Sequence, residues 1–314
     1  MNLPPQFWFK WQRFKTALRG AFGSREQSYE TSHRMCPHCR GLIERNASVC
    51  PLCGGSVKAP ASRAGTGTPG RVLGGLIPVP STATSALVAA NIALYGISWY
   101  LTQAAAQSGA GVGSGGIDGV VLVRLGAKYG PLVFAGEWWR LVTAMFLHAG
   151  LLHIGMNLWC LFDLGPTVES LFSTTKFIVI YLITGILGFV LSLFWSPFGL
   201  SIGASGAVLG LIGALMGASF HHGSLGKDLR SQLWRWVIYI FAFGLIGGVF
   251  GMGTDNAAHL GGLLSGVALG YFVPQGEPTT RSSETLWNTL AVISVIIIAA
   301  SFALMALQLN RPIG

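Results

Sequence analysis

The most informative segment of this chain is Ser201-Ile202-Gly203-Ala204-Ser205-Gly206-Ala207-Val208-Leu209-Gly210. It places one serine between small residues at the start of a long apolar segment. A hydroxyl there would lie within a lipid bilayer, where polar groups are costly and usually functional. A second stretch, Asp255-Asn256-Ala257-Ala258-His259-Leu260-Gly261-Gly262, sets a histidine among small residues. Together they predict two closely packed membrane helices that bring Ser205 and His259 together.

The composition is that of a membrane protein. Of 314 residues, 51% are hydrophobic and 10% are charged, against roughly 25% charged in an average soluble domain. The 44 glycines suit closely packed transmembrane helices. We expect no cleavable signal peptide, because the N-terminus lacks an uninterrupted apolar core followed by a small-residue cleavage site.

Seven apolar segments predict an all-α polytopic membrane protein, because a span needs about 20 residues. They lie near 84–103, 146–166, 176–196, 203–220, 235–251, 257–274 and 286–308. The segment 104–145 separates the first two. We expect its glycine-rich beginning to be flexible and its amphiphilic second part, through Glu137-Trp138-Trp139-Arg140, to lie in the membrane interface.

Basic residues predict the orientation. The net charge is +9, and most Lys and Arg precede residue 80. If successive spans cross the membrane in alternating directions, the N-terminal side also contains Lys176, Lys227, Arg230, Arg235 and Arg281. The opposite side then contains Arg124, Lys128, Arg140 and Arg311. This bias predicts a cytoplasmic N-terminus. Ser205 and His259 then lie near the outer ends of their helices, at a similar shallow depth, and a bacterial plasma (inner) membrane is the simplest setting.

The N-terminal part predicts a small metal site. A basic aromatic segment, 1–30, precedes a region, 31–58, that contains Cys36-Pro37-His38-Cys39 and Cys50-Pro51-Leu52-Cys53. Two such pairs can place four thiolates, those of Cys36, Cys39, Cys50 and Cys53, around a structural Zn²⁺. A redox pair and a ribbon that has lost its ion are the alternatives. The region resembles a zinc ribbon, and a linker, 59–83, follows it. We expect it to dock a cytoplasmic partner, and we do not expect nucleic-acid binding.

Ser205 and His259 have the residue types of a nucleophile and its general base. A serine hydroxyl is a poor nucleophile until a neutral histidine within about 3 Å removes its proton. His153 and Asn157 lie four residues apart and share a helix face. They can donate hydrogen bonds to a developing oxyanion, as can the Ser205 N–H at a helix N-terminus. For His153 alone, a buried structural histidine is the simpler interpretation.

An acidic third member of the group is not expected. Asp163 is predicted to lie near the cytoplasmic end of its helix, and Asp255 is predicted to face a loop or water. The sequence therefore favours a Ser-His dyad, which needs no cofactor for catalysis.

The chain resembles the rhomboid family of intramembrane serine proteases over about 84–275. The matching residues are Trp139-Arg140, His148 with His153 and Asn157, Gly203-Ala204-Ser205-Gly206, Glu169, Tyr181-Leu182 with Gly185, and Ala258-His259 with Gly262 and Gly266. The resemblance implies a six-helix core, with a seventh helix and tail over 276–314. It implies that Ser205 is the nucleophile, His259 the base, and His153 and Asn157 the oxyanion ligands. His148 would support the outer loop or a water network, and the clients would be transmembrane proteins within the lipid bilayer.

One position departs from the family pattern. The residue one turn after the serine is often aromatic in the family and packs under the histidine, whereas here it is Leu209. We expect a looser imidazole with catalysis retained. The ribbon lies outside the shared core, so the resemblance implies nothing about its role.

Two other functions compete with the endopeptidase. A catalytically silent rhomboid-like protein would bind membrane clients without cleaving them, but such relatives usually lack the serine or the histidine. A channel or transporter would need an inverted repeat or a series of ionisable residues across the bilayer, and the predicted spans show neither.

Overall fold

A computed structural model of the chain describes residues 33–36, 42–44, 49–56, 81–107, 116–249 and 253–309. The chain divides into two compact units, Met1–Val79 and Pro80–Gly314, and each is described by itself. The predicted basic aromatic segment lies outside the described residues, as does the predicted linker up to residue 80.

The first unit contains a short antiparallel hairpin. Strand β1 (His33–Met35) pairs with β2 (Leu42–Glu44), with His33 opposite Glu44. An isolated bridge joins Val49 to Ser56 across the turn that carries Cys50 and Cys53. The bridge thus closes the turn that carries Cys50 and Cys53.

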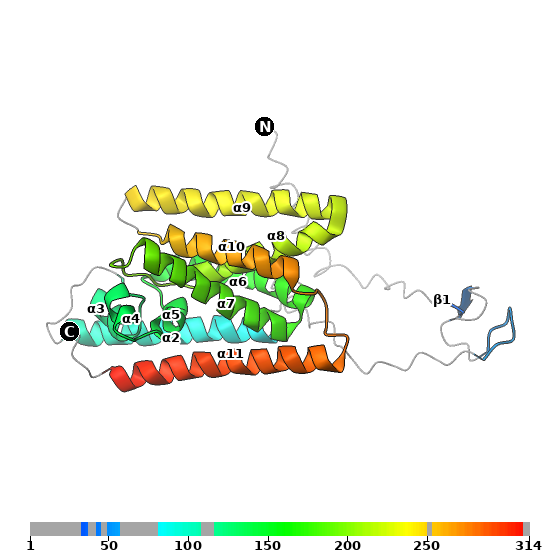
Figure 1. The fold of residues 1–314 in the computed structure, drawn as a ribbon, viewed down its shortest axis with the longest axis horizontal. Helices are drawn as coiled ribbons and strands as arrows, with labels where there is room; N and C mark the ends of the chain where they lie inside the picture. Colours follow the sequence, from blue (N-terminus) through cyan, green and yellow to red (C-terminus); the bar gives the residue numbers. More distant parts are fainter. Residues whose placement is uncertain are drawn as a thin grey trace, which may run out of the picture. The chain divides into compact units, whose positions relative to one another are not determined.

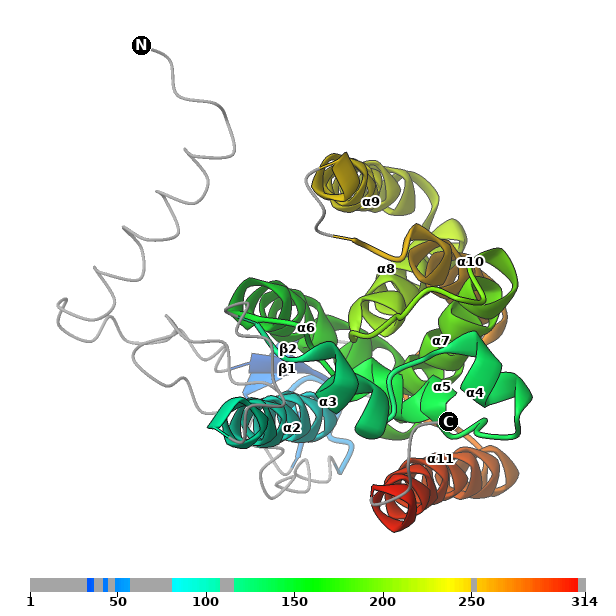
Figure 2. The same cartoon turned by 90° about the vertical axis from the view of Figure 1, so that its left-hand side faces the viewer.

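The second unit is a bundle whose long helices coincide with the seven predicted apolar segments (Figure 1). Viewed end on, α8 lies among α6, α7 and α10, while α9 and α11 occupy opposite edges (Figure 2). The all-α prediction is therefore confirmed for this unit. The bounds are α2 Thr82–Gln107, α6 Leu151–Phe172, α7 Thr174–Trp195, α8 Ser205–Ser219, α9 Gly223–Val249, α10 Asn256–Phe272 and α11 Arg281–Gln308.

Helix α6 ends later than predicted. The expected end was residue 166, yet the helix continues through Pro166 to Phe172. Proline removes one backbone donor, which a membrane helix tolerates when neighbouring groups satisfy the freed carbonyl. The helix stops where Ser173 adopts a positive φ of 82°. Asp163 consequently lies in the middle part of α6, and the prediction that it lies near the helix end is wrong.

Not every helix is long enough to span a bilayer by itself. Within the described residues, α2, α7 and α11 meet the length and hydropathy of a span, and α6 does so together with the helical segment Arg140–Phe146, from which it is bent by 92°. The 15 residues of α8 and the 17 of α10 extend about 22 and 26 Å, less than the ~30 Å hydrocarbon core. Because α8 is buried along almost its whole length, protein rather than lipid surrounds it.

Glycines bring α8 and α10 into backbone contact. A Cβ at Gly262 would collide with the carbonyl oxygen of Gly206, and one at Gly266 would collide with that of Gly210. Gly270 meets the carbonyl of Ala214 in the same way. This four-residue repeat extends the small-residue face predicted on the His259 helix by one turn, and it permits the close approach typical of membrane helix pairs.

The loop region before α6 is a folded element with a buried cation. It contains α3 (Gly119–Arg124), α4 (Gly130–Phe134), α5 (Arg140–Thr143) and the 3₁₀ helix η2 (Ala144–Phe146). Arg140 is 5% exposed and pairs with Glu137, and its Nη1 donates to the carbonyls of Val123 (2.6 Å) and Ala127 (3.1 Å). Arg140 is thus buried within this element, whereas Trp138 is exposed, and the position of the segment in the membrane interface stays a prediction.

We predict that Gly262→Leu lowers the free energy of unfolding by about 2–3 kcal/mol, because overpacking a close helix contact forces the backbones apart. The measurement is thermal unfolding in detergent. Gly96→Leu is the matched control, since a Cβ at Gly96 in α2 meets no atom within 4 Å. Equal melting temperatures for the two variants would contradict the tight contact.

Candidate active site

Ser205 and His259 meet at the same end of two adjacent helices. Ser205 is the first residue of α8, and His259 lies in the first turn of α10. His259 Nε2 lies 2.7 Å from Ser205 Oγ, which is a hydrogen-bond distance. His259 is 6% exposed and Ser205 is half-buried. The geometry required of a nucleophile and its base is present.

Asp255 orients the start of α10 without touching the imidazole. Its carboxylate accepts a hydrogen bond from the Ala258 N–H (2.9 Å) as the helix N-cap, and it also accepts one from the hydroxyl of Ser192 in α7. The prediction that Asp255 faces loop or water is thus wrong. His259 Nδ1 has no hydrogen-bond partner within the described part of the chain, so no carboxylate of that part is bonded to the imidazole.

An aromatic ring from α9 packs against the imidazole. The centroids of Phe241 and His259 are 5.9 Å apart, and the rings are nearly perpendicular at 82°. Leu209, one turn after Ser205, is buried. Edge-to-face pairs stabilise ring orientation. Phe241 therefore provides an aromatic contact that Leu209 cannot, and the looser imidazole stays a prediction.

His153 and Asn157 lie beside the backbone that precedes Ser205. A Cβ at Gly203, whose φ is +121°, would meet His153 Nε2 first and Asn157 Nδ2 at 3.7 Å. His153 Nδ1 accepts from the Ala149 N–H at 3.4 Å, so a neutral ring carries its proton on Nε2. Donors from both side chains therefore lie beside Gly203, two residues before Ser205 at the N-terminus of α8.

His148 supports His153 from behind. It is fully buried, and its ring packs edge-on against His153 with centroids 4.9 Å apart. Neither of its ring nitrogens has a partner among the described residues. The site thus contains a further buried imidazole that packs against His153.

A buried lysine holds the loop that carries the serine. Lys128 Nζ donates to the carbonyls of Ser196 (2.8 Å) and Gly199 (3.1 Å), and the Lys128 and Ser201 backbones form a two-way bridge. Burial lowers the pKa of Lys128, and the carboxylate of Asp255 acts in the opposite direction. Non-helical backbone at membrane depth is tolerated only inside protein. The hydrogen bonds from Lys128 satisfy backbone groups of this loop, so its non-helical backbone is tolerated there.

The structure brings all four predicted site residues, Ser205, His259, His153 and Asn157, into one cluster. Sequence reasoning missed Phe241 and Lys128. The sequence around Phe241 does not indicate a role in the site, because the contact of Phe241 with His259 depends on how α9 packs. Lys128 could have been suspected because it is one of two cations, with Arg124, in a largely apolar loop segment.

Three of the four predicted zinc ligands are described, and their thiols lie together. The Sγ atoms of Cys36, Cys50 and Cys53 are all within 4.8 Å of one another. Cys36 and Cys50 are buried, and Cys53 is exposed. Cys39 lies outside the described residues. Clustered thiolates are a donor set that Zn²⁺ prefers, so the residues present fit that ion.

Comparison with known proteins identifies the helical unit. Residues 135–276 match the Rhomboid domain. Rhomboid-like protease 3 of Toxoplasma gondii is 33% identical over 189 residues, which cover 60% of this chain and 72% of that protein. The chain belongs to the rhomboid family.

Other rhomboid relatives share a smaller part of their length. Rhomboid protease GluP of Bacillus subtilis (strain 168) is 36% identical over 61% of this chain, which spans 36% of that protein. RHOMBOID-like protein 6, mitochondrial, of Arabidopsis thaliana is 38% identical over 48% of this chain and 49% of its own length. The predictions of an all-α polytopic rhomboid fold and of an integral membrane protein are confirmed by the family and by the apolar helices.

We predict that Phe241→Ala slows cleavage of a model transmembrane client, because the imidazole loses its edge-to-face contact. An aromatic pair contributes about 0.5–1.5 kcal/mol, so kcat should fall roughly three- to tenfold. KM should change little, and Phe241→Tyr should retain activity.

Tyr239→Ala is the control, since Tyr239 is an exposed aromatic residue on the same helix. If Phe241→Ala raised KM with kcat unchanged, Phe241 would contact the client rather than position the base.

Proposed function

We propose that this rhomboid protein is an intramembrane serine endopeptidase that cleaves transmembrane segments of membrane proteins. The observation that carries the proposal is the 2.7 Å contact of Ser205 Oγ with His259 Nε2, next to the donors of His153 and Asn157. Chains that only bind clients would have no need for this arrangement. GluP and the Toxoplasma relative are both named as proteases.

His259 acts as the general base and then as the general acid. Its Nε2 takes the Ser205 proton as Oγ attacks the client carbonyl, and it returns that proton to the leaving amine. Water then attacks the acyl-enzyme, with His259 again as the base. The N-terminus of α10 disfavours the imidazolium, and the Asp255 carboxylate at the N-cap offsets this effect.

His153, Asn157 and the Ser205 N–H stabilise the oxyanion. His153 Nε2 carries the proton because Nδ1 is occupied by the Ala149 N–H. Donors already in place act most strongly where water is excluded. His148 keeps the His153 ring in position through its edge-on contact.

We predict that a fluorophosphonate probe labels the purified protein at Ser205. Ser205→Ala and His259→Ala should each lower client cleavage by about a thousandfold or more, because dyad members act as a unit. Ser265→Ala is the matched control, since the Ser265 hydroxyl donates only to carbonyls of its own helix.

Undiminished cleavage by Ser205→Ala would end the endopeptidase proposal. Retention of clients by the unaltered protein without any turnover would favour the silent client-binding alternative.

The thiols of Cys36, Cys39, Cys50 and Cys53 would hold a structural Zn²⁺ in a ribbon that docks a cytoplasmic partner. Such a closed site supplies folding energy to its own small unit and no open position for catalysis. The thiol cluster of the three described ligands supports this assignment.

We predict about one zinc per chain by metal analysis, and less than half of that in Cys36→Ser. Cys160→Ser, in the helical unit, should keep its zinc, and deletion of 1–60 should leave core proteolysis intact. Full zinc content in Cys36→Ser would contradict the site.

The basic residues support an orientation with the N-terminus cytoplasmic and the dyad toward the outer face of a bacterial plasma membrane. Lys176 and Arg281 lie at the starts of α7 and α11, and Lys227, Arg230 and Arg235 lie in the first part of α9. Apart from Arg235, which lies near the middle of the 27-residue α9, these positions share the end of the bundle opposite Ser205, in agreement with the positive-inside rule.

A further inference from the structure

Helix α11 follows the part of the chain that matches the Rhomboid domain, which ends at residue 276. It begins at Arg281 and ends at Gln308. Figure 2 shows α11 beside α5 at the edge of the bundle, and it also contacts α7. The family match therefore assigns no role to this helix, although the helix packs against the folded region that precedes the site.

Phe302 connects α11 to the 3₁₀ helix η2. Its ring packs edge-on against that of Phe146, with centroids 5.5 Å apart and an angle of 69° between the rings. Phe146 is fully buried, and Phe302 is half-buried. Edge-to-face aromatic pairs favour one relative orientation of the two rings. The pair therefore fixes the position of η2 relative to α11.

A short path of contacts leads from η2 to the oxyanion donors. The Ala144 carbonyl, at the start of η2, accepts a hydrogen bond from the Gly203 N–H at 2.8 Å. Gly203 in turn lies against His153 and Asn157, because a Cβ at this position would meet both side chains. A displacement of η2 would therefore move the backbone that precedes Ser205 relative to these two donors.

A buried apolar cluster makes a second connection between α11 and the same loop. Met305, three residues after Phe302, is 8% exposed and belongs to a cluster with Leu147, against which Ile202 packs. Phe302 packs against this cluster and also against the central core of the bundle. The C-terminal part of α11 thus supports η2 and the loop before Ser205 together.

Lys176 of α7 holds the opposite end of α11. Its Nζ donates to the carbonyls of Pro274 (2.7 Å) and Gly276 (2.8 Å), in the segment that leads into α11. The same Nζ lies 5.7 Å from the centroid of the Trp287 ring, and a cation above an aromatic face is stabilising. Trp287 precedes Phe302 by 15 residues, or about 22 Å along the helix. Attachment at both ends makes α11 a fixed support.

We propose that α11 is a positioning element of the active site and that it acts through Phe302. The Phe302 ring holds η2, and η2 holds Gly203 beside the oxyanion donors through the Ala144 carbonyl. Because Phe302 acts through Phe146, it is a positioning residue and not a catalytic one. The inference rests on the proposed endopeptidase function and extends it to a helix outside the matched domain.

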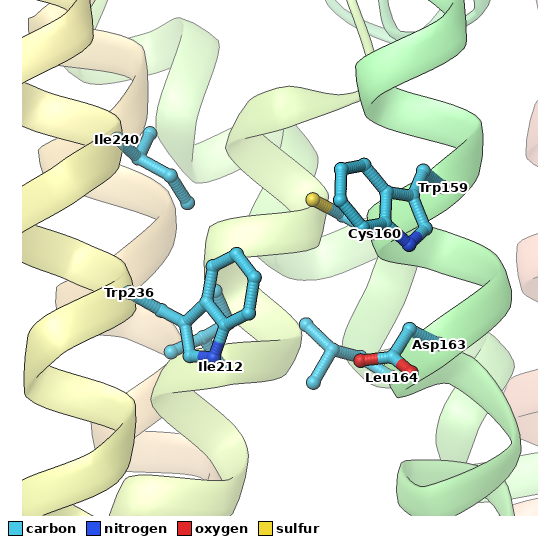
Figure 3. A pocket seen from close by; sticks show the side chains of 7 residues that line it. All are labelled: Trp159, Cys160, Asp163, Leu164, Ile212, Trp236 and Ile240. Carbon is cyan, nitrogen blue, oxygen red and sulfur yellow. The ribbon is translucent and has the colours of Figure 1, made fainter. Parts of the chain in front are cut away.

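The effect of Phe302 is expected on turnover. The seven side chains that line the pocket in Figure 3 all belong to α6, α8 and α9. A substitution in α11 therefore leaves the side chains of that pocket unchanged. A change in kcat would come from the path through Phe146 and η2.

The test measures kcat and KM of the purified full-length protein for a model transmembrane client, and titration with a fluorophosphonate counts the reactive serines. Phe302→Ala should lower kcat per titrated serine by about three- to tenfold, the factor for one lost aromatic pair, with KM unchanged. Phe302→Tyr should restore kcat. Because kcat is referred to titrated serines, a smaller folded fraction does not lower it.

Leu307→Ala is the matched control, since Leu307 is 77% exposed near the same end of α11. It should leave kcat and KM unaltered.

A double-mutant cycle separates positioning from general loosening. In the Asn157→Ala background, one of the two donors beside Gly203 is absent, so Phe302→Ala should lower kcat by about twofold at most. An equal factor in both backgrounds would show that Phe302 acts independently of the oxyanion donors, and it would overturn the proposal.

The two proposals fail differently. An unchanged kcat in Phe302→Ala, or a raised KM with kcat unchanged, overturns the role of α11 and leaves the protease intact. Absence of both client cleavage and Ser205 labelling in the unaltered protein overturns the proposed function instead.

Discussion

The backbone contact between α8 and α10 is the constraint on which the rest of this molecule depends. Two helices come this close where glycine removes the side chain from at least one of them, and Gly262, Gly266 and Gly270 of α10 meet that condition in successive turns. Ser205 and His259 sit at the first turn of their helices. The separation of the helix axes therefore sets the distance between hydroxyl and imidazole, and larger residues in the repeat would part them.

A second constraint acts on the loop before Ser205. Its backbone is not helical, yet Ser201 and Ala204 are buried. Lys128 binds two carbonyls of this loop, and the Gly203 N–H donates to the Ala144 carbonyl. Because these bonds satisfy the buried backbone, Gly203 can lie directly against His153. The folded region around Arg140 thus supports the site as well as covering it.

The local pattern of the sequence was sufficient for the helices and for the four clustered residues. Apolar length located each helix, and the spacing of His153 and Asn157 placed both on one face. Features that depend on tertiary packing were not predictable. Phe241 reaches His259 only because of the position of α9, and Lys128 is buried only because the loop folds over it.

Helix ends were the weakest predictions, and one of them mattered. A proline usually ends a helix in water, whereas α6 passes through Pro166. Because the prediction ended this helix at residue 166, it placed Asp163 near the helix end, whereas Asp163 lies in the middle part of α6. Likewise α8 is shorter than a span because protein surrounds it, which a count of apolar residues does not reveal.

The most direct test of this account is a crystal structure of the protein after reaction with a fluorophosphonate. We predict a covalent bond from phosphorus to Ser205 Oγ, with the phosphonyl oxygen within about 3 Å of His153 Nε2 and Asn157 Nδ2. His259 Nε2 should remain within hydrogen-bond distance of Oγ, and the α8 and α10 backbones should remain in contact. An adduct on another residue, or an oxygen directed away from both donors, would contradict the account.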